Sequence, residues 1–343
     1  MGNITIVRGV LILLICLGVY GSPAISQTPT SVPFGRVTLH AHNCFPEDGR
    51  WTDRIDRALG TSVQPIAVEQ DVVWYVDPAT GTGRSVVAHG GTPTGKEPTL
   101  EDHFFKKVRP IIERALSENK RDTWPVVYLH FNFRDSDPAF MQDIWEILGH
   151  HEEWLTTAER RADESEIMPL KLGPLMALTE NGQEEAFYQK VPVGSRLRVF
   201  GTMPAGRAPR ARTEDREAQA TAAVATSPEI VIPARATNYR RWMNFPWAVV
   251  ERGGQPKAGE WTPADAARLH ALVERAHAMG LWIRFYTLNG HTPEANQGWS
   301  DGYNFGSLAA ARLRWKASID ASVDFLATDQ YELLAKELKQ AHR

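Results

Sequence analysis

The sequence has very little cysteine, only Cys16 and Cys44 among 343 residues. Two cysteines cannot form the disulfide framework of a small exported domain, so stability must come from a hydrophobic core. An excess of positive charge is also missing: 38 basic side chains face 41 acidic ones, for a formal net charge of −3. This balance excludes nucleic acid as the expected partner. The remaining composition, 43% hydrophobic and 23% charged, is that of a globular protein.

One apolar run stands out, and it lies at the N-terminus. Arg8 is the only charged residue among the first 26, and it precedes an apolar run over residues 9–20 that is followed by Ala24-Ile-Ser26. A basic start, a short apolar run and a small-x-small site are typical of a secretory signal peptide. The run is shorter than the roughly 20 residues that span a bilayer, although an uncleaved anchor is the alternative. We expect residues 1–26 to direct export to the periplasm or the medium, which leaves Cys44 as the single thiol.

Short β-branched runs and helical patterns alternate from residue 35 to the C-terminus. This order predicts parallel strands connected by helices, and the number of units favours closure into a single (β/α)8 TIM barrel over residues 35–343. The segment 204–228 is rich in Ala, Arg, Thr and Pro and is predicted to be a flexible surface insertion. Expected strands are 36–40, 64–75, 85–88, 124–131, 173–178, 196–200, 229–232, 281–286 and 323–326; expected helices are 100–119, 140–161, 263–279, 308–318 and 330–340.

Two carboxylates on one expected strand point to a charged interior. Residues i and i+2 of a strand share a face, so Glu69 and Asp71 both project into the barrel. Two unpaired buried carboxylates would be costly unless a cation neutralises them. Oxygen ligands favour Mg²⁺ or Ca²⁺, whereas ion pairs with Arg134 or Arg284 would serve equally well. The spacing leaves both alternatives open.

Histidines gather at the same end of the expected barrel. His40 and His42 share a face at the end of the first strand, and His89 follows the hairpin after the second. Imidazole titrates near neutral pH, so two histidines can act as general base and general acid in one turnover.

These residues occur in an order that resembles the phospholipase-C-like phosphodiesterase superfamily, which includes glycerophosphodiester phosphodiesterases and phosphatidylinositol-specific phospholipases C. The resemblance extends, in patches, over about residues 36–335. It rests on His40-x-x-Asn43, Ala58-Leu-Gly60, Ile66 to Val72, Val86 to Gly90, Asn132-Phe-Arg134, Ala276 to Tyr286 and Val323 to Asp329.

The resemblance implies a barrel that hydrolyses a small-molecule or lipid phosphodiester, with peripheral membrane contact for a lipid substrate. Two positions depart from the family pattern: Asn132 is neutral where an acid is usual, and Tyr286 stands where Trp is frequent. The implied roles are acid/base catalysis for His40 and His89, binding of one divalent cation, Mg²⁺ or Ca²⁺, for Glu69, Asp71 and Asn132, and substrate binding for His42, Asn43, Arg134, Arg284 and Tyr286. For His42, which is an extra polar residue, a role as a ligand, as a spectator or in acid/base catalysis stays open.

Other functions compete with this one. A His-x-His at the end of the first strand is also found in amidohydrolase-like barrels that bind Zn²⁺ or Mn²⁺. That class needs further inward histidines, but His130 is expected one residue away from the inward position and His277 falls on a helix. The cluster from His150 to Glu153 lies at a helix boundary and is expected to be solvated. A barrel that has lost turnover and acts as a binding protein is the second alternative.

Overall fold

Eight parallel strands close into a (β/α)8 barrel, as expected. The computed structural model describes residues 1–2, 37–47, 49–180, 183–206, 216–252, 259–286, 288–295 and 304–341. Each barrel strand pairs in parallel with the next, and β11 pairs with β1 to complete the circle. In barrel order the strands are β1 (Thr38–Ala41), β2 (Ile66–Val76), β4 (Val127–Phe133), β6 (Leu175–Thr179), β8 (Val199–Thr202), β9 (Arg240–Pro246), β10 (Trp282–Tyr286) and β11 (Phe325–Thr328).

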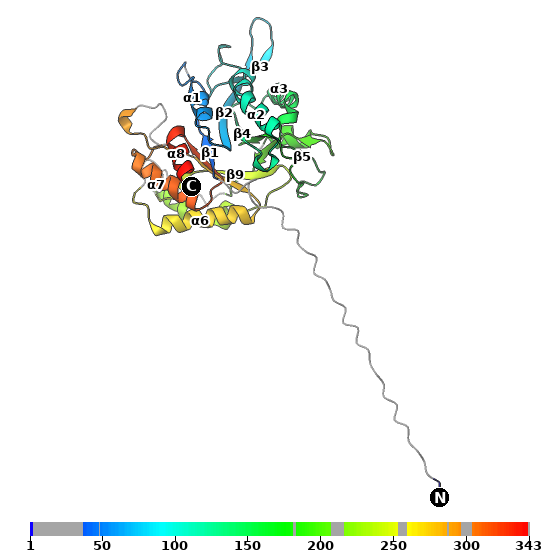
Figure 1. The fold of residues 1–343 in the computed structure, drawn as a ribbon, viewed down its shortest axis with the longest axis vertical. Coiled ribbons are helices and arrows are strands. Elements are labelled where there is room, and N and C mark those ends of the chain that lie inside the picture. The colour runs from blue at the N-terminus through cyan, green and yellow to red at the C-terminus, as the bar shows by residue number, and fades with distance from the viewer. Residues whose placement is uncertain are drawn as a thin grey trace.

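Helices cover the outside of the barrel (Figure 1). Their apolar faces pack on the strands; in α2, for example, Val108 and Ile112 are buried. Short 3-10 and π segments occupy other connections, among them Glu101–Phe105 and Glu185–Gln189. The α-helices are α1 (Arg54–Gly60), α2 (Lys106–Glu118), α3 (Pro138–His150), α4 (Arg216–Ala225), α5 (Pro228–Val231), α6 (Pro263–Ala278), α7 (Leu308–Asp320) and α8 (Tyr331–Ala341).

Strand β2 has 11 residues and extends beyond the other strands of the barrel. Its outer half, from Val72 to Val76, pairs antiparallel with β3 (Gly83–Val87), and this hairpin projects beyond the barrel in Figure 1. A second, two-stranded sheet joins β5 (Ala158–Glu159) to β7 (Arg196–Leu197) on the outside. The hairpin leads into the segment that carries His89 and thereby brings it to the carboxyl end of the barrel.

Side chains inside the barrel form tiers, because every second residue of a strand points inward. The lowest tier is aromatic: Tyr128 and Trp242 lie with their ring centroids 5.0 and 6.3 Å from that of Phe325. Two residues further along the strands stand His40 and His130, both buried. Beyond these histidines lies the carboxyl end of the barrel, where polar residues follow the strands. The aromatic tier thus closes the barrel from below and leaves one open end.

Three sequence-based assignments of secondary structure were wrong. The helical pattern expected over 140–161 ends with α3 at His150, and a 3-10 turn and β5 follow. Residues 229–232 were expected to be a strand, but α5 occupies Pro228–Val231, where Ser227 precedes a proline at the first helical position. The strand that completes the barrel, β9, was not predicted; its arginines and Asn244 hide the apolar alternation of Trp242, Met243 and Phe245.

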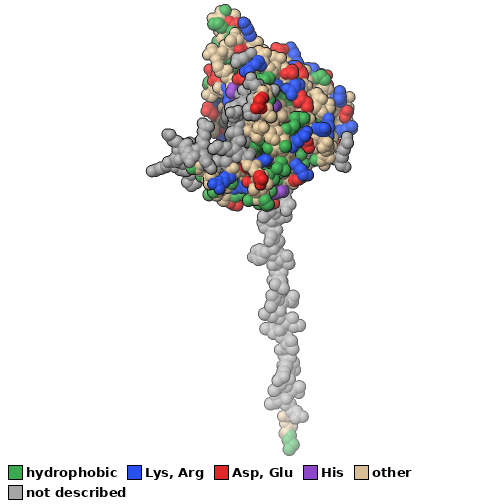
Figure 2. All heavy atoms as spheres, turned by 90° about the vertical axis from the view of Figure 1, so that its left-hand side faces the viewer, with side chains coloured by type: hydrophobic (Ala, Val, Ile, Leu, Met, Phe, Trp, Pro, Cys, Tyr) green, Lys and Arg blue, Asp and Glu red, His purple; other side chains and the backbone are tan. Residues whose placement is uncertain are grey.

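The segment 204–228, expected to be a flexible insertion, contains α4. Residues 207–215 of that segment lie outside the described residues, and so does the expected export signal from residue 3 onward. Among the residues that the structure describes, none of the helices is both long and apolar enough to cross a membrane. Figure 2 shows acidic and basic side chains interspersed over the visible face, as the balanced composition predicts.

Candidate active site

A polar cavity opens at the carboxyl end of the barrel, the end at which barrel enzymes carry their catalytic residues. Its volume is about 280 Å³, and among the described residues of its lining Phe133 is the one with a purely apolar side chain. A cavity of this character suits a small charged ligand. The other lining residues are His42, Asn43, Glu69, His89, Asn132, Arg134, Glu180, Arg284 and Tyr286.

Strand β2 places its two carboxylates inside the barrel, as the i, i+2 rule predicts. Gln70, between them, points outward, where its amide donates to the Cys44 carbonyl at 2.6 Å and its oxygen lies 2.7 Å from His103 Nδ1. Glu69 and Asp71 both pair with arginine: Arg284 Nη2 donates to Glu69 Oε2 at 2.8 Å, and Arg134 Nε donates to Asp71 Oδ2. The ion-pair alternative is therefore realised for both carboxylates.

Arg284 is the centre of a buried charge network. On β10 its guanidinium also donates to Glu180 Oε1 at 3.1 Å and to Asn244 Oδ1 at 2.8 Å, while Asn244 Nδ2 donates to the same Glu180 oxygen at 2.6 Å. Burial raises the pKa of Glu180, helped by the charge of Glu69 and opposed by Arg284. Burial likewise holds the pKa of Asp71 well above its usual range, against the pull of Arg134. Arg284 thus connects the carboxylates of Glu69 and Glu180, which come from two different strands, in the wall of the cavity.

His42 is held by a carboxylate. Its Nδ1 lies 2.8 Å from Asp329 Oδ1, and Asn43 Nδ2 donates to the two Asp329 oxygens at 3.1 and 3.2 Å. Burial alone would raise the pKa of Asp329, but His42, Arg54 and Asn43 keep it below the ordinary value. An ionised carboxylate only accepts hydrogen bonds, so the contact with Asp329 requires the proton on Nδ1 of His42, whereas the Asn43 amide, 2.8 Å from the same nitrogen, donates to the other tautomer. The opposite nitrogen, Nε2, faces Glu69 Oε2 at 4.0 Å.

His89 reaches the cavity from the other side. Its ring stacks on Phe45 with centroids 5.8 Å apart, and its Nδ1 lies 3.4 Å from Glu47 Oε1. Burial and the positive charge of Arg134 lower its pKa, although Glu47 acts in the opposite direction. Two imidazoles, each with a carboxylate behind one nitrogen, therefore line the same cavity.

His40, to which the resemblance gives a catalytic role, does not line the cavity. It lies on β1 one tier lower, 1% exposed, with its Nδ1 3.4 Å from Arg284 Nη2. His130 lies beside it, with ring centroids 4.9 Å apart. The prediction that His130 misses the inward position was wrong, because β4 pairs His130 with Glu69 and Asn132 with Asp71. Burial, followed by the charge of Arg284, holds the pKa of both imidazoles well below the usual range.

Two groups of residues have the chemistry to hold a cation. His40, Glu69 and His130 are buried, their ligand atoms lie within 4.8 Å of one another, and this group could hold a metal ion. The predicted oxygen donors, Glu69, Asp71 and Asn132, also share the inner face of β2 and β4. Asp71 Oδ1 is buried without a hydrogen-bond partner among the described residues, which fits a hard cation in need of oxygen ligands.

The other histidine clusters lie away from the cavity. His277, on α6 as expected, places its Nε2 2.9 Å from Asp324 Oδ2. His151 stacks on Phe105 with centroids 4.1 Å apart and lies 2.8 Å from Glu101 Oε2. Among the residues that the structure describes, the segment from His150 to Glu153 forms no metal cluster.

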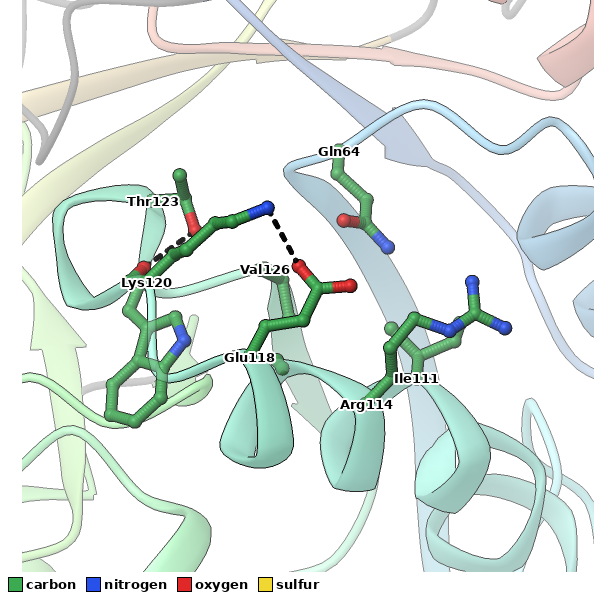
Figure 3. Close-up of a pocket in the computed structure, with 9 residues that line it drawn as sticks. Gln64, Ile111, Arg114, Glu118, Lys120, Thr123 and Val126 are labelled. Carbon is green, nitrogen blue, oxygen red and sulfur yellow. Dashed lines mark hydrogen bonds and ion pairs between the residues drawn. The ribbon is translucent and has the colours of Figure 1, made fainter.

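A smaller hollow of about 160 Å³ lies at the opposite end of the barrel (Figure 3). Gln64 and Val126, which precede β2 and β4, form part of its wall together with Arg114 of α2. The Lys120 ammonium is 3.2 Å from Glu118 Oε2, so its charge is already balanced. This end of a barrel carries stability more often than chemistry.

Sequence reasoning missed four residues that complete the site: Glu180, Asn244, Asp329 and Glu47. Glu180 lies two residues after the predicted strand 173–178 and directly after the observed β6, so its position near a strand end was available as a signal. Asp329 belongs to the last quoted motif but received no role. Asn244 was lost with the unrecognised β9, and Glu47 lies in a loop, where no periodicity marks it.

Comparisons with known proteins add a likeness of fold. No family model matches the chain, and no curated protein matches it. Among solved structures, a glycerophosphodiester phosphodiesterase from Parabacteroides distasonis aligns over 90% of this chain and 99% of its own, with 12% identity and a TM-score of 0.43. A 7,8-dihydropteroate synthase from Vibrio fischeri aligns over 90% and 92%, with 14% identity and a TM-score of 0.34.

Proposed function

We propose that the protein is a phosphodiesterase that hydrolyses a small, polar phosphodiester in the cavity at the carboxyl end of the barrel. One observation carries this proposal: two imidazoles, His42 and His89, and two guanidinium groups, Arg134 and Arg284, line the same cavity. A phosphodiester carries one negative charge, and its hydrolysis needs charge neutralisation together with proton transfer to and from oxygen.

The roles follow from the surroundings of each group. His42, whose Nδ1 proton is held by Asp329, takes the proton of the attacking water or substrate hydroxyl on Nε2, and Asp329 stabilises the imidazolium that forms. The bond from phosphorus to the leaving oxygen then breaks, and protonated His89 donates its proton to that oxygen. Arg134 and Arg284 neutralise the phosphate oxygens. The general base is thus assigned to His42 in place of His40, which the barrel interior keeps from substrate.

A divalent ion, Mg²⁺ or Ca²⁺, fits the same proposal. Bound by Glu69, Asp71 and Asn132, it would polarise the phosphoryl group and neutralise its charge. Glu69, Asp71 and Glu180 carry three negative charges if all are ionised, whereas Arg134 and Arg284 carry two positive charges. The negative charge that remains favours a bound cation. The protein's part is to hold the donors on adjacent strands.

The polar lining favours a glycerophosphodiester with a hydrophilic head group. Among the described residues that line the cavity, only Phe133 and the ring of Tyr286 offer apolar contact to an acyl chain, which favours a substrate whose chains, if any, stay outside. Export of the protein, expected from residues 1–26, would place it where such diesters are scavenged from outside the cytoplasm.

The test is hydrolysis of bis(4-nitrophenyl) phosphate and of a panel of glycerophosphodiesters and lysophospholipids. We expect His42→Ala and His89→Ala each to lower kcat/KM by about 10²–10⁴-fold, the range for general acid–base catalysis. His270→Ala, an exposed histidine of α6, is the matched control. Wild-type protein without turnover on any diester would leave the binding-protein alternative.

The metal is tested separately by dialysis against a chelator. We expect loss of activity and its recovery with Mg²⁺ or Ca²⁺, and no recovery in Asp71→Asn. Full activity after chelation would refute the metal while leaving the phosphodiesterase in place, because the two arginines would then supply all the positive charge.

A further inference from the structure

Beneath the cavity, the second tier of the barrel holds two histidines and a carboxylate, between the aromatic tier below and the charge network of Arg284. We propose that His40, Glu69 and His130 form a transition-metal site of the Zn²⁺ class, which shares Glu69 with the oxygen-donor site above it but draws its other ligands from the two imidazoles. The ligand atoms of the three side chains lie within 4.8 Å of one another, and all three residues are buried.

The imidazole nitrogens of this tier have unused bonding capacity. His40 Nε2, His130 Nδ1 and His130 Nε2 are buried without a hydrogen-bond partner in the described part of the chain. His130 Nε2 comes within 3.4 Å of Glu180 Oε1 but makes no hydrogen bond to it. Leaving a buried polar group unpaired costs about 1–3 kcal/mol, so a ligand that takes up these lone pairs relieves a real penalty.

The donor set selects the class of ion. Two imidazoles and one carboxylate suit Zn²⁺, whereas the harder Mg²⁺ and Ca²⁺ prefer all-oxygen sites. Bonds of about 2.0–2.2 Å in a tetrahedral set require ligand atoms about 3.4 Å apart. The ligand atoms, now within 4.8 Å of one another, therefore have to approach by up to about 1.4 Å around the ion.

The packing below and the cavity above fit such a site. Trp242 stands edge-on to His130 with centroids 5.0 Å apart, and Phe325 stands edge-on to His40 at 6.2 Å, so the floor is rigid and apolar. Glu69 also lines the cavity, which provides a way in for the ion.

Arg284 is the competitor for this site. Its Nη2 donates to Glu69 Oε2 and lies 3.4 Å from His40 Nδ1. On metal binding, Arg284 would keep its hydrogen bonds to Glu180 and Asn244. Its hydrogen bond to Glu69 would be replaced by a bond from Glu69 to the ion. The metal site does not require phosphodiesterase activity, because its ligands are defined by the barrel interior alone.

Titration of the chelator-treated full chain with CoCl₂ tests the site, because four-coordinate Co²⁺ absorbs strongly in the visible region. We expect one equivalent to bind, and His130→Gln to weaken binding about tenfold or more. The surface variant His270→Ala should bind like wild type.

Absence of the absorption band in wild type, or its persistence in His130→Gln, would overturn the proposal, as would its loss in His270→Ala. If His130→Gln fails to fold, X-ray absorption of the Zn²⁺-loaded wild type decides: scattering from two imidazoles supports the site, and a shell of oxygen alone refutes it.

Discussion

Replacement of Asp329 by asparagine is the sharpest test of the roles assigned here. The side chain keeps its shape, but the negative charge behind His42 Nδ1 is lost at a hydrogen bond of 2.8 Å. A hydrogen bond to a charged group contributes about 1.5–3 kcal/mol, which corresponds to about a 10- to 150-fold loss of rate. With the carboxylate gone, both the Asn43 amide, 2.8 Å from Nδ1, and the introduced amide can donate to Nδ1, which moves the ring proton to Nε2 and removes the base; we therefore expect kcat/KM to fall on the order of 10³–10⁴-fold.

The same substitution predicts a pH-dependent change in stability. The folded state lowers the pKa of Asp329, so its contribution is fully present above the unfolded pKa of about 3.9 and is lost as the pH falls through the folded value. Urea unfolding should show Asp329→Asn to be less stable than wild type at pH 7, with the difference shrinking toward pH 3.

Asp320→Asn, an exposed carboxylate at the end of α7, controls for the loss of one charge. Hydrolysis of bis(4-nitrophenyl) phosphate by Asp329→Asn within threefold of wild type, with an unchanged pH profile, would refute the role of Asp329 in orienting His42.

Two further predictions concern stability alone. Arg284→Met leaves Glu69 and Glu180 without their guanidinium partner, so urea unfolding should show a loss of about 3–5 kcal/mol, the cost of breaking a buried ion pair; a loss below 1 kcal/mol would contradict the network. Burial lowers the pKa of His103 to about 4, below the unfolded value of about 6.5, so wild type should lose about 2 kcal/mol between pH 7 and pH 5. His103→Gln, which keeps a hydrogen bond to Gln70 but cannot titrate, should lose less over that interval, and equal losses would refute the assignment.

The sequence was sufficient to predict the barrel because most strands are short, buried and β-branched. The exception, β9, shows the limit of this signal. Three polar residues, Arg240, Arg241 and Asn244, interrupt its apolar pattern. The two arginines donate hydrogen bonds to backbone carbonyls, and Asn244 accepts one from Arg284. Periodicity is least able to find a strand whose apolar pattern is interrupted by polar residues.

The sequence was sufficient to predict most residues of the site, but not how deep in the barrel each of them lies. Residues i and i+2 share a face, so the alternation rule could not separate His40 from His42; both point inward. Their difference is one of height along β1, which ends at Ala41. His40 therefore lies within the strand and is buried, whereas His42 follows the strand and lines the cavity. Only the position of the strand end, uncertain from sequence by a residue or two, assigns the role.

The ion pairs inside the barrel are themselves an argument for function. Burying a charge is costly, and a buried ion pair often contributes less stability than apolar side chains of similar size would. The aromatic tier around Phe325 shows that this barrel can close its interior without charge. Above this aromatic tier, however, the carboxylates of Glu69, Asp71 and Glu180 pair with arginines. Their partners are Arg134 and Arg284, which line the cavity. Stability alone does not account for this arrangement, whereas an anionic ligand that must displace or share those partners does.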